Sequence, residues 1–118
     1  YVQHTLHSHY IDVYTGHNTD HVDREYSGYN AGEYNTYAAD ITDDAVIIYD
    51  ANGCTEDNPQ IAFTYENQHL ENEAELMQWP FSGGFHIILS VGPAGPNAIN
   101  PDDCPSYMLV DWVRVTKL

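Results

Sequence analysis

The sequence is poor in basic residues. Only Arg24, Arg114 and Lys117 are basic among 118 residues, against eighteen acidic ones, so the formal net charge is −15. Such a charge disfavours nucleic acid and anionic membrane surfaces as partners. It is compatible with neutral glycans, with cations, or with copies of the same chain bridged by metal ions.

Cysteine is scarce, and long apolar runs are missing. No run approaches the roughly 20 residues of a transmembrane helix, and a start at Tyr1 is consistent with a removed leader. Cys54 and Cys104 lie in loop-like contexts, and no CxxC or zinc-ligand spacing occurs. We therefore expect an extracellular protein, secreted or on the cell surface, with a Cys54–Cys104 disulfide. Two free thiols in a cytosolic protein are the alternative.

What remains is a set of short β-branched or aromatic segments bounded by turn residues, which is typical of an antiparallel β protein. Ten tyrosines against three phenylalanines suit a half-hydrated sheet. We expect a single domain over residues 1–118. The expected strands are Val2–Tyr14, Tyr34–Thr42, Ala45–Asp50, Ile61–Tyr65, Phe85–Val91 and Tyr107–Val115, with turns at 42–44 and 51–53 and one short helix at Asn72–Trp79, stopped by Pro80.

Five segments match the motifs of one enzyme family in the family's order. They are "TLHSHY" (5–10), "EYNTYAADIT" (33–42), "AVIIYDANG" (45–53), "QWPFSGGFHIILSVG" (78–92) and "MLVDWVRV" (108–115). Together they resemble the C-terminal half of glycoside hydrolase family 16, the laminarinase-like β-glucanases. The resemblance implies an all-β fold, a concanavalin-A-like jelly-roll β-sandwich that is truncated relative to the full family domain.

The catalytic strand of that family has no counterpart here. A retaining glycosidase needs two carboxylates about 5–5.5 Å apart, and the family carries them on a Glu-x-Asp-x-x-Glu strand that precedes the TLH motif. Here this motif begins at Thr5, so we expect no catalytic residue in the chain and no enzyme activity of the chain alone. The alternating Glu71, Glu73 and Glu75 lack an apolar face, and we interpret them as a solvated loop or short helix.

Candidate carbohydrate contacts come from histidine and aromatic residues. His7 matches the family's cleft histidine, and His9 shares its strand face, with His4 on the other face. Tyr34 and Tyr37 lie in a tyrosine-rich segment and could stack on sugars or pack against another subunit, although packing in the core or at a sheet edge is the default role of tyrosine in a β protein. Trp79 either joins the glycan site or plugs the end of the sandwich.

Other family positions differ in this chain. The Trp that follows Glu in the family is Ile41 here, the Asn of its "ILN" is Ser90, and the His of its F-H-x-Y is Asn35. Loss of the Trp weakens the stacking platform for a sugar ring. These differences favour a cleft that no longer serves catalysis.

No cofactor is predicted with certainty, and calcium is the one we consider. Asp111 matches a calcium ligand of the family, whose other ligands come from the N-terminal half. Calcium needs six to eight oxygens, so Asp111 would need further acidic partners. His7, His9 and Asp12 could instead share zinc or copper.

We therefore expect a non-catalytic extracellular module related to family 16. It would bind a glycan of the β-glucan type, self-assemble through open sheet edges into a structural oligomer or filament, or do both. The alternative is a C-terminal fragment of a retaining endo-β-glucanase, whose catalytic strand lies on a missing segment or on another chain.

Overall fold

The computed structural model describes residues 1–8, 24–51, 55, 57–92 and 100–117. The chain falls into two units, Tyr1–Gly84 (unit 1) and Phe85–Leu118 (unit 2). The described part is mostly β-structure with little helix, in agreement with the expected all-β class. The expectation of a single domain over 1–118 stays a prediction.

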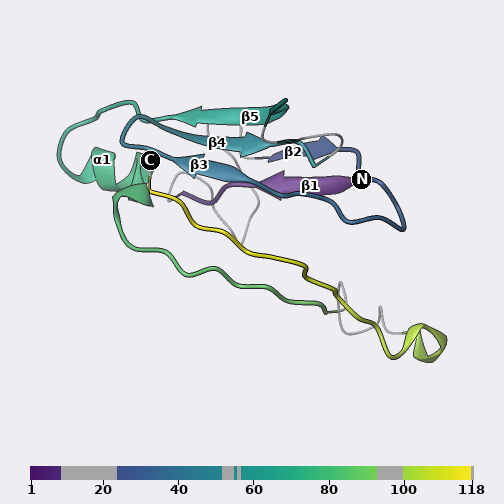
Figure 1. Cartoon of the computed structure of the whole chain (residues 1–118). Coiled ribbons are helices and arrows are strands. Elements are labelled where there is room, and N and C mark those ends of the chain that lie inside the picture. The colour runs from purple at the N-terminus through teal and green to yellow at the C-terminus, as the bar shows by residue number, and fades with distance from the viewer. Residues whose placement is uncertain (9–23, 52–54, 56, 93–99, 118) are drawn as a thin grey trace. The chain divides into compact units, whose positions relative to one another are not determined.

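Unit 1 contains two small antiparallel sheets (Figure 1). The first pairs β1 (Val2–Thr5) with β2 (Arg24–Ser27), and the second has the order β3-β4-β5. Its strands are β3 (Ala39–Ile41), β4 (Ala45–Tyr49) and β5 (Ile61–Glu66). The expected strands at 45–50 and 61–65 are therefore confirmed, whereas β2 was not predicted.

The turn predicted at 42–44 is present and is held by one hydroxyl. Thr42 Oγ1 accepts hydrogen bonds from the backbone N–H groups of Asp44 and Ala45, at 3.2 and 2.9 Å. The backbone N–H of Thr42 in turn donates to the carbonyl of Ala45 at 2.9 Å. This arrangement reverses the chain between β3 and β4, as a threonine-led turn does.

The strand predicted over 34–42 is wrong at its start. Only Ala39–Ile41 form β3, because the side chain of Asn35 closes a loop upstream. Its Oδ1 accepts from Asn30 N–H at 2.7 Å, and its Nδ2 donates to the carbonyls of Asn30 and Glu33 at 2.9 and 3.0 Å. Gly32, with φ +82°, provides the left-handed residue that this loop requires.

The first expected strand, 2–14, is confirmed only over Val2–Thr5, since residues 9–14 lie outside the described part. The turn expected at 51–53 also falls largely outside it. The short helix is confirmed as α1 (Glu73–Gln78), which is followed by the 3-10 turn η1 (Pro80–Ser82). No helix among the described residues has the length and apolar character needed to cross a membrane.

The core of unit 1 joins β1, the three-stranded sheet and the segment after α1. Its buried members are Leu6, Val46, Phe63, Tyr65, Trp79 and Phe81. Three of their rings interlock: Tyr65 and Trp79 lie parallel with centroids 6.0 Å apart, and Phe81 meets both edge-on at 5.9 and 5.1 Å. Offset-parallel and edge-on pairs are the arrangements that aromatic quadrupoles favour.

One buried amide ties α1 to the end of β5. Gln78 is completely buried, and its Nε2 donates to the carbonyl of Glu66 at 2.8 Å. Its Oε1 accepts from the backbone N–H of Gln68 at 3.0 Å, while its own carbonyl accepts from Tyr65 OH at 2.9 Å. The amide nitrogen and the amide oxygen of this side chain each have a hydrogen-bond partner. Its burial therefore leaves neither atom unsatisfied.

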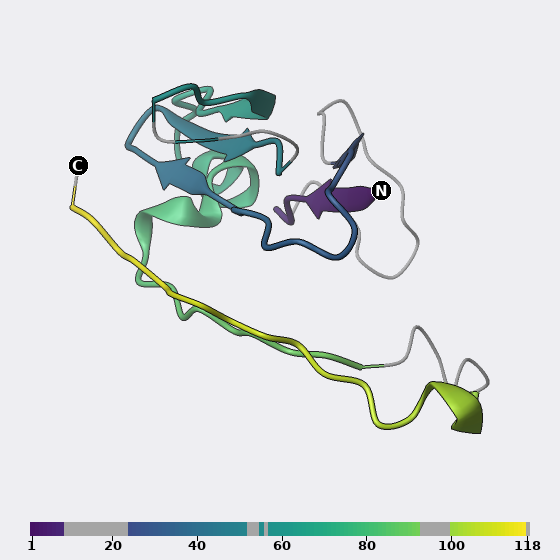
Figure 2. The ribbon, with the colours of Figure 1, turned by 45° about the vertical axis from the view of Figure 1, so that its right-hand side comes forward.

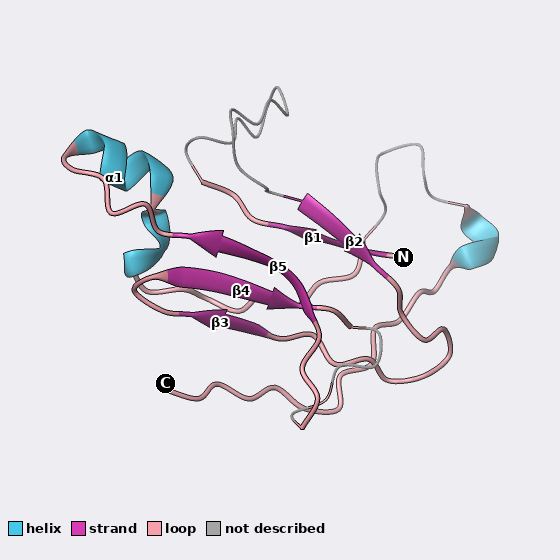
Figure 3. Ribbon diagram, turned by 90° about the horizontal axis from the view of Figure 1, so that it is seen from above, coloured by secondary structure: helices cyan, strands magenta, loops and turns pink. Residues whose placement is uncertain are grey.

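Unit 2 contains the 3-10 turn η2 (Pro101–Asp103) between two extended segments, 85–92 and 104–117 (Figures 2 and 3). None of its described residues belongs to a β-strand. The strands expected at 85–91 and 107–115 are therefore wrong for this structure. The two segments run side by side in Figures 1 and 2, but their described residues are not assigned to a strand.

We expect Gln78→Leu to lower the free energy of unfolding by about 2–4 kcal/mol, because it leaves the Gln68 N–H and the Glu66 carbonyl without their partner. Urea denaturation followed by tryptophan fluorescence measures the effect. Gln60→Leu makes the same change at an exposed position and should alter stability by less than about 0.5 kcal/mol. Equal effects of the two substitutions would contradict the role we assign to the buried amide.

Candidate functional site

An open depression of about 300 Å³ lies in unit 1, where β1 approaches the start of β3. It is lined by His4, Thr5, Tyr37, Ala38, Ala39 and Ile48. The volume is at the lower end of the range for small-molecule sites. The lining combines an imidazole, a hydroxyl, a phenol ring and aliphatic groups, and it contains no carboxylate and no cationic side chain.

The alternation of β1 sets the first part of this lining. His4, Leu6 and Ser8 are buried, whereas His7 is exposed. His4 Nε2 lies 2.6 Å from Ser27 Oγ. Ser27 belongs to β2 and pairs with Val2 of β1, so the neighbouring strand holds the imidazole ring. This contact restrains the position of the imidazole at the edge of the depression.

The second part comes from the segment that leads into β3. The N–H of Tyr49 donates to the carbonyl of Ala38 at 3.1 Å, which extends the β3–β4 ladder by one step. Ala39 pairs with Ile48 in that ladder, so both face the depression from a fixed register. Tyr37 directly precedes this ladder and is 60% exposed.

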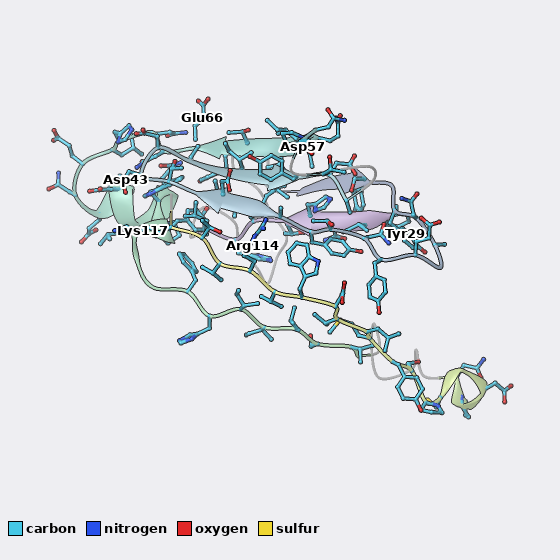
Figure 4. All side chains as sticks on the ribbon, in the orientation of Figure 1. Tyr29, Asp43, Asp57, Glu66, Arg114 and Lys117 are labelled. Carbon is cyan, nitrogen blue, oxygen red and sulfur yellow. The ribbon has the colours of Figure 1, made fainter. Side chains whose placement is uncertain are left out.

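Exposed tyrosines extend the aromatic surface of unit 1 beyond the depression. Tyr1, Tyr26, Tyr29, Tyr34 and Tyr37 are 47–85% exposed, and Figure 4 labels Tyr29 among the side chains. Tyr1 and Tyr26 meet edge-on with centroids 5.3 Å apart. Rings presented in this way offer an apolar face and a hydrated hydroxyl to a ligand.

The predicted carbohydrate contacts differ in exposure and in whether they line the depression. Tyr34 and Tyr37 are exposed, and Tyr37 lines the depression. His7 is exposed but is not part of that lining, and His9 lies outside the described residues. Trp79 is only 4% exposed and is stacked on Tyr65 in the core. Its buried indole offers no ring face to a sugar, and the structure places it as a packing residue.

Sequence reasoning missed His4 and Thr5 among the polar lining residues, and it assigned His4 to the face opposite the candidate pair. A signal was present in the alternation. Leu6 is the aliphatic residue of the 4–6–8 series, and period two places His4 on the same face as Leu6. An apolar residue marks the buried face of a strand better than a pair of histidines does.

The predicted cysteine pair is not supported. Cys104 is an exposed free thiol whose Sγ lies 3.9 Å from the carbonyl oxygen of Asn100, and Cys54 lies outside the described residues. No disulfide occurs in the part of the chain that the structure describes.

The predicted metal ligands are not brought together. Asp111 is exposed, and the described residues contain no group of three or more His, Cys, Asp or Glu side chains that could hold a metal ion. Asp12, like His9, falls outside the described part. Both the calcium and the zinc or copper interpretations stay predictions.

Acidic side chains dominate the rest of unit 1. Fifteen of the eighteen acidic residues lie in 1–84, with Arg24 as the only basic one in that range. Among the described acidic side chains, Asp40 Oδ2 accepts from Tyr49 OH at 2.7 Å, and Asp44 Oδ1 lies 3.1 Å from His69 Nε2. The Asp44–His69 pair is largely exposed and contributes little to stability.

Comparisons with known proteins give two partial matches. The chain is 35% identical over 92 residues to the keratan-sulfate endo-1,4-beta-galactosidase of Sphingobacterium multivorum, covering 76% of this chain and 19% of that protein. It is 31% identical over 58 residues to the beta-glucanase of Rhodothermus marinus, covering 45% of this chain and 20% of that protein. The chain thus spans about a fifth of the length of the curated relatives it matches. No protein-family model and no solved structure matches it.

Both relatives are named as enzymes that act on glycans. The matches support a partial relationship to glycoside hydrolases and a function connected with carbohydrate.

We expect Ser27→Ala to cost about 1–2 kcal/mol of stability, because it leaves the buried Nε2 of His4 without its recorded partner. Ser90→Ala removes the same hydroxyl from an exposed position of unit 2 and should be close to neutral. Thermal and urea unfolding of both variants provide the measurement. A neutral Ser27→Ala would show that the hydroxyl does not hold the imidazole.

Proposed function

We propose that this chain is a non-catalytic module that contacts a neutral β-linked glycan through unit 1, by way of the depression and the exposed tyrosines around it. The observation that carries the proposal is the lining itself: Tyr37, Thr5 and His4 with aliphatic neighbours, and no carboxylate. A pyranose ring has an apolar C–H face and a rim of hydroxyls. An aromatic ring and a few hydrogen-bonding groups suit such a ligand.

The absence of carboxylates from the lining separates binding from cleavage. Retaining hydrolysis needs one carboxylate to attack the anomeric carbon and a second to protonate the leaving oxygen. A depression lined by imidazole, hydroxyl and phenol groups can orient a sugar but supplies no such pair. For this reason we propose that the depression binds a glycan and does not cleave it.

Charge supports a neutral ligand. One relative is named for a sulfated glycan, and fifteen acidic residues against one basic residue in 1–84 would repel a sulfated polymer. A β-glucan carries no charge and meets no such barrier. We assign this module to the family-16 jelly-roll lineage on the five ordered motifs, and we propose an extracellular location, where such glycans occur.

A second candidate is favoured by the names of both relatives, which describe glycan-cleaving enzymes. In this interpretation the chain is the C-terminal part of a retaining endo-β-glucanase whose acid strand lies elsewhere. Self-assembly through open sheet edges stays a prediction.

Affinity electrophoresis and a reducing-sugar assay distinguish these functions. We expect laminarin or lichenan at millimolar concentration to retard the chain, keratan sulfate not to retard it, and no glycan to release reducing ends. Release of reducing sugar would support the enzyme candidate and overturn ours. Retardation by keratan sulfate alone would overturn the neutral ligand, and no retardation at all would remove the binding function.

We expect Tyr37→Ala to weaken the retardation by laminarin about tenfold, which corresponds to about 1.4 kcal/mol, because the ring is the aromatic face of the depression. The matched control is Tyr107→Ala, which removes a tyrosine that is 77% exposed in unit 2. Dissociation constants from the electrophoretic series provide the comparison. Equal losses in the two variants would place the glycan away from the depression.

A further inference from the structure

The small sheet of β1 and β2 in unit 1 has one buried face and one exposed face (Figures 1 and 3). His4 and Leu6 of the first strand segment are buried. Tyr1 and Gln3, which alternate with them, are exposed, and Thr5 is half-buried. Because successive side chains of a strand point to opposite faces, the second series shares the exposed face.

Tyr26 of β2 joins this exposed face. It pairs with Gln3 across the sheet, and the side chains of directly opposite residues lie on the same face. Its ring is 51% exposed and meets Tyr1 edge-on, with centroids 5.3 Å apart. In an edge-on pair each ring restrains the other, so the two tyrosines present a positioned aromatic surface. We call Tyr1, Gln3, Thr5 and Tyr26 together the β1–β2 face.

Polar side chains lie beside the two rings. Gln3 Nε2 donates a hydrogen bond to Thr5 Oγ1 at 2.8 Å. The described residues offer no partner to the second N–H or to the carbonyl oxygen of this exposed amide, so both can bond to a sugar hydroxyl. The side chains of the β1–β2 face are all uncharged, although unit 1 has fifteen acidic residues. Rings beside neutral donors and acceptors suit a neutral sugar.

Thr5 connects the β1–β2 face to the depression. His4 and Thr5 both line the depression although they point to opposite faces of β1, so the depression lies along the edge of this strand. Thr5 and Tyr26 are diagonal neighbours in the sheet, a spacing of about 7–8 Å. A sugar seated in the depression therefore leaves the Tyr26 ring to a later sugar of the same glycan chain.

We propose that the β1–β2 face is a second glycan subsite, which binds a later sugar of the neutral β-glucan chain whose first sugars occupy the depression. The inference rests on the proposed glycan function and adds a dependence on chain length to it. Stacking on Tyr26 and hydrogen bonds to Gln3 are contacts that a short saccharide in the depression does not make. The module therefore prefers a long glycan to its short fragments.

Isothermal titration calorimetry with laminaribiose and laminarihexaose tests the second subsite. We expect the unmodified chain to bind the hexasaccharide about tenfold more tightly than the disaccharide. Tyr26→Ala should remove this difference by weakening the hexasaccharide alone. Tyr37→Ala should weaken both saccharides, because its ring lines the depression. Tyr107→Ala, which removes an exposed tyrosine of unit 2, is the matched control and should change neither affinity.

Gln3→Ala is a second variant that alters only an exposed side chain. We expect it to weaken hexasaccharide binding about threefold, whereas Gln60→Ala, at another exposed position, should have no effect. Tyr26→Phe keeps the ring and should retain most of the hexasaccharide affinity. Far-ultraviolet circular dichroism checks that each variant keeps the fold of the unmodified chain, and Gln3→Ala decides the matter where Tyr26→Ala does not fold.

The outcomes separate this inference from the proposed function on which it rests. Failure of the unmodified chain to bind either saccharide would overturn the glycan function and the second subsite together. Equal affinities for the two saccharides, or equal losses for both in Tyr26→Ala, would overturn the second subsite and leave the depression as the glycan site.

Discussion

The fully buried amide of Gln78 is the contact on which the order of unit 1 depends. It bonds the backbone on both sides of the end of β5, and the adjacent carbonyl receives Tyr65 OH. These bonds position the next residue, Trp79, in the core, where its ring stacks on Tyr65. A buried amide with partners for both ends favours a single arrangement, since any shift would leave polar groups without partners. The same constraint explains why Trp79 is a packing residue and not a platform for a sugar.

The sequence predicts those elements whose signals are local. β4, β5 and α1 follow from short apolar runs, a threonine-led turn and a proline stop. β2 was missed because Arg24–Ser27 has no apolar alternation and exists only by pairing with β1. The late start of β3 has a different cause: the amide of Asn35 competes with strand pairing by bonding the backbone of its own loop. Neither effect can be read from periodicity.

The candidate site was predicted only in part, because only some of its residues have a local signal in the sequence. Tyr37 could be named from the sequence because tyrosines crowd its segment, and the structure exposes it beside the depression. The alternation of the first strand places His4 on the face of Leu6, which belongs to the buried cluster with Val46 and Phe63. It does not indicate which residues of the other sheet His4 meets. The approach of β1 to the start of β3 brings together residues more than thirty positions apart. Composition contains no information about such a juxtaposition.

Unit 2 shows that strand propensity alone does not determine whether a segment forms a strand. The segments 85–91 and 107–115 have the strongest strand sequences in the chain, yet their described residues form no strand. β-structure is a property of a pair of segments, since half of the backbone groups of a strand must be satisfied by a neighbour. Side chains that are apolar on both faces add the requirement that layers cover the strand from above and below. Whether residues 107–115 form a strand therefore depends on which segment pairs with their backbone and on what covers their two apolar faces.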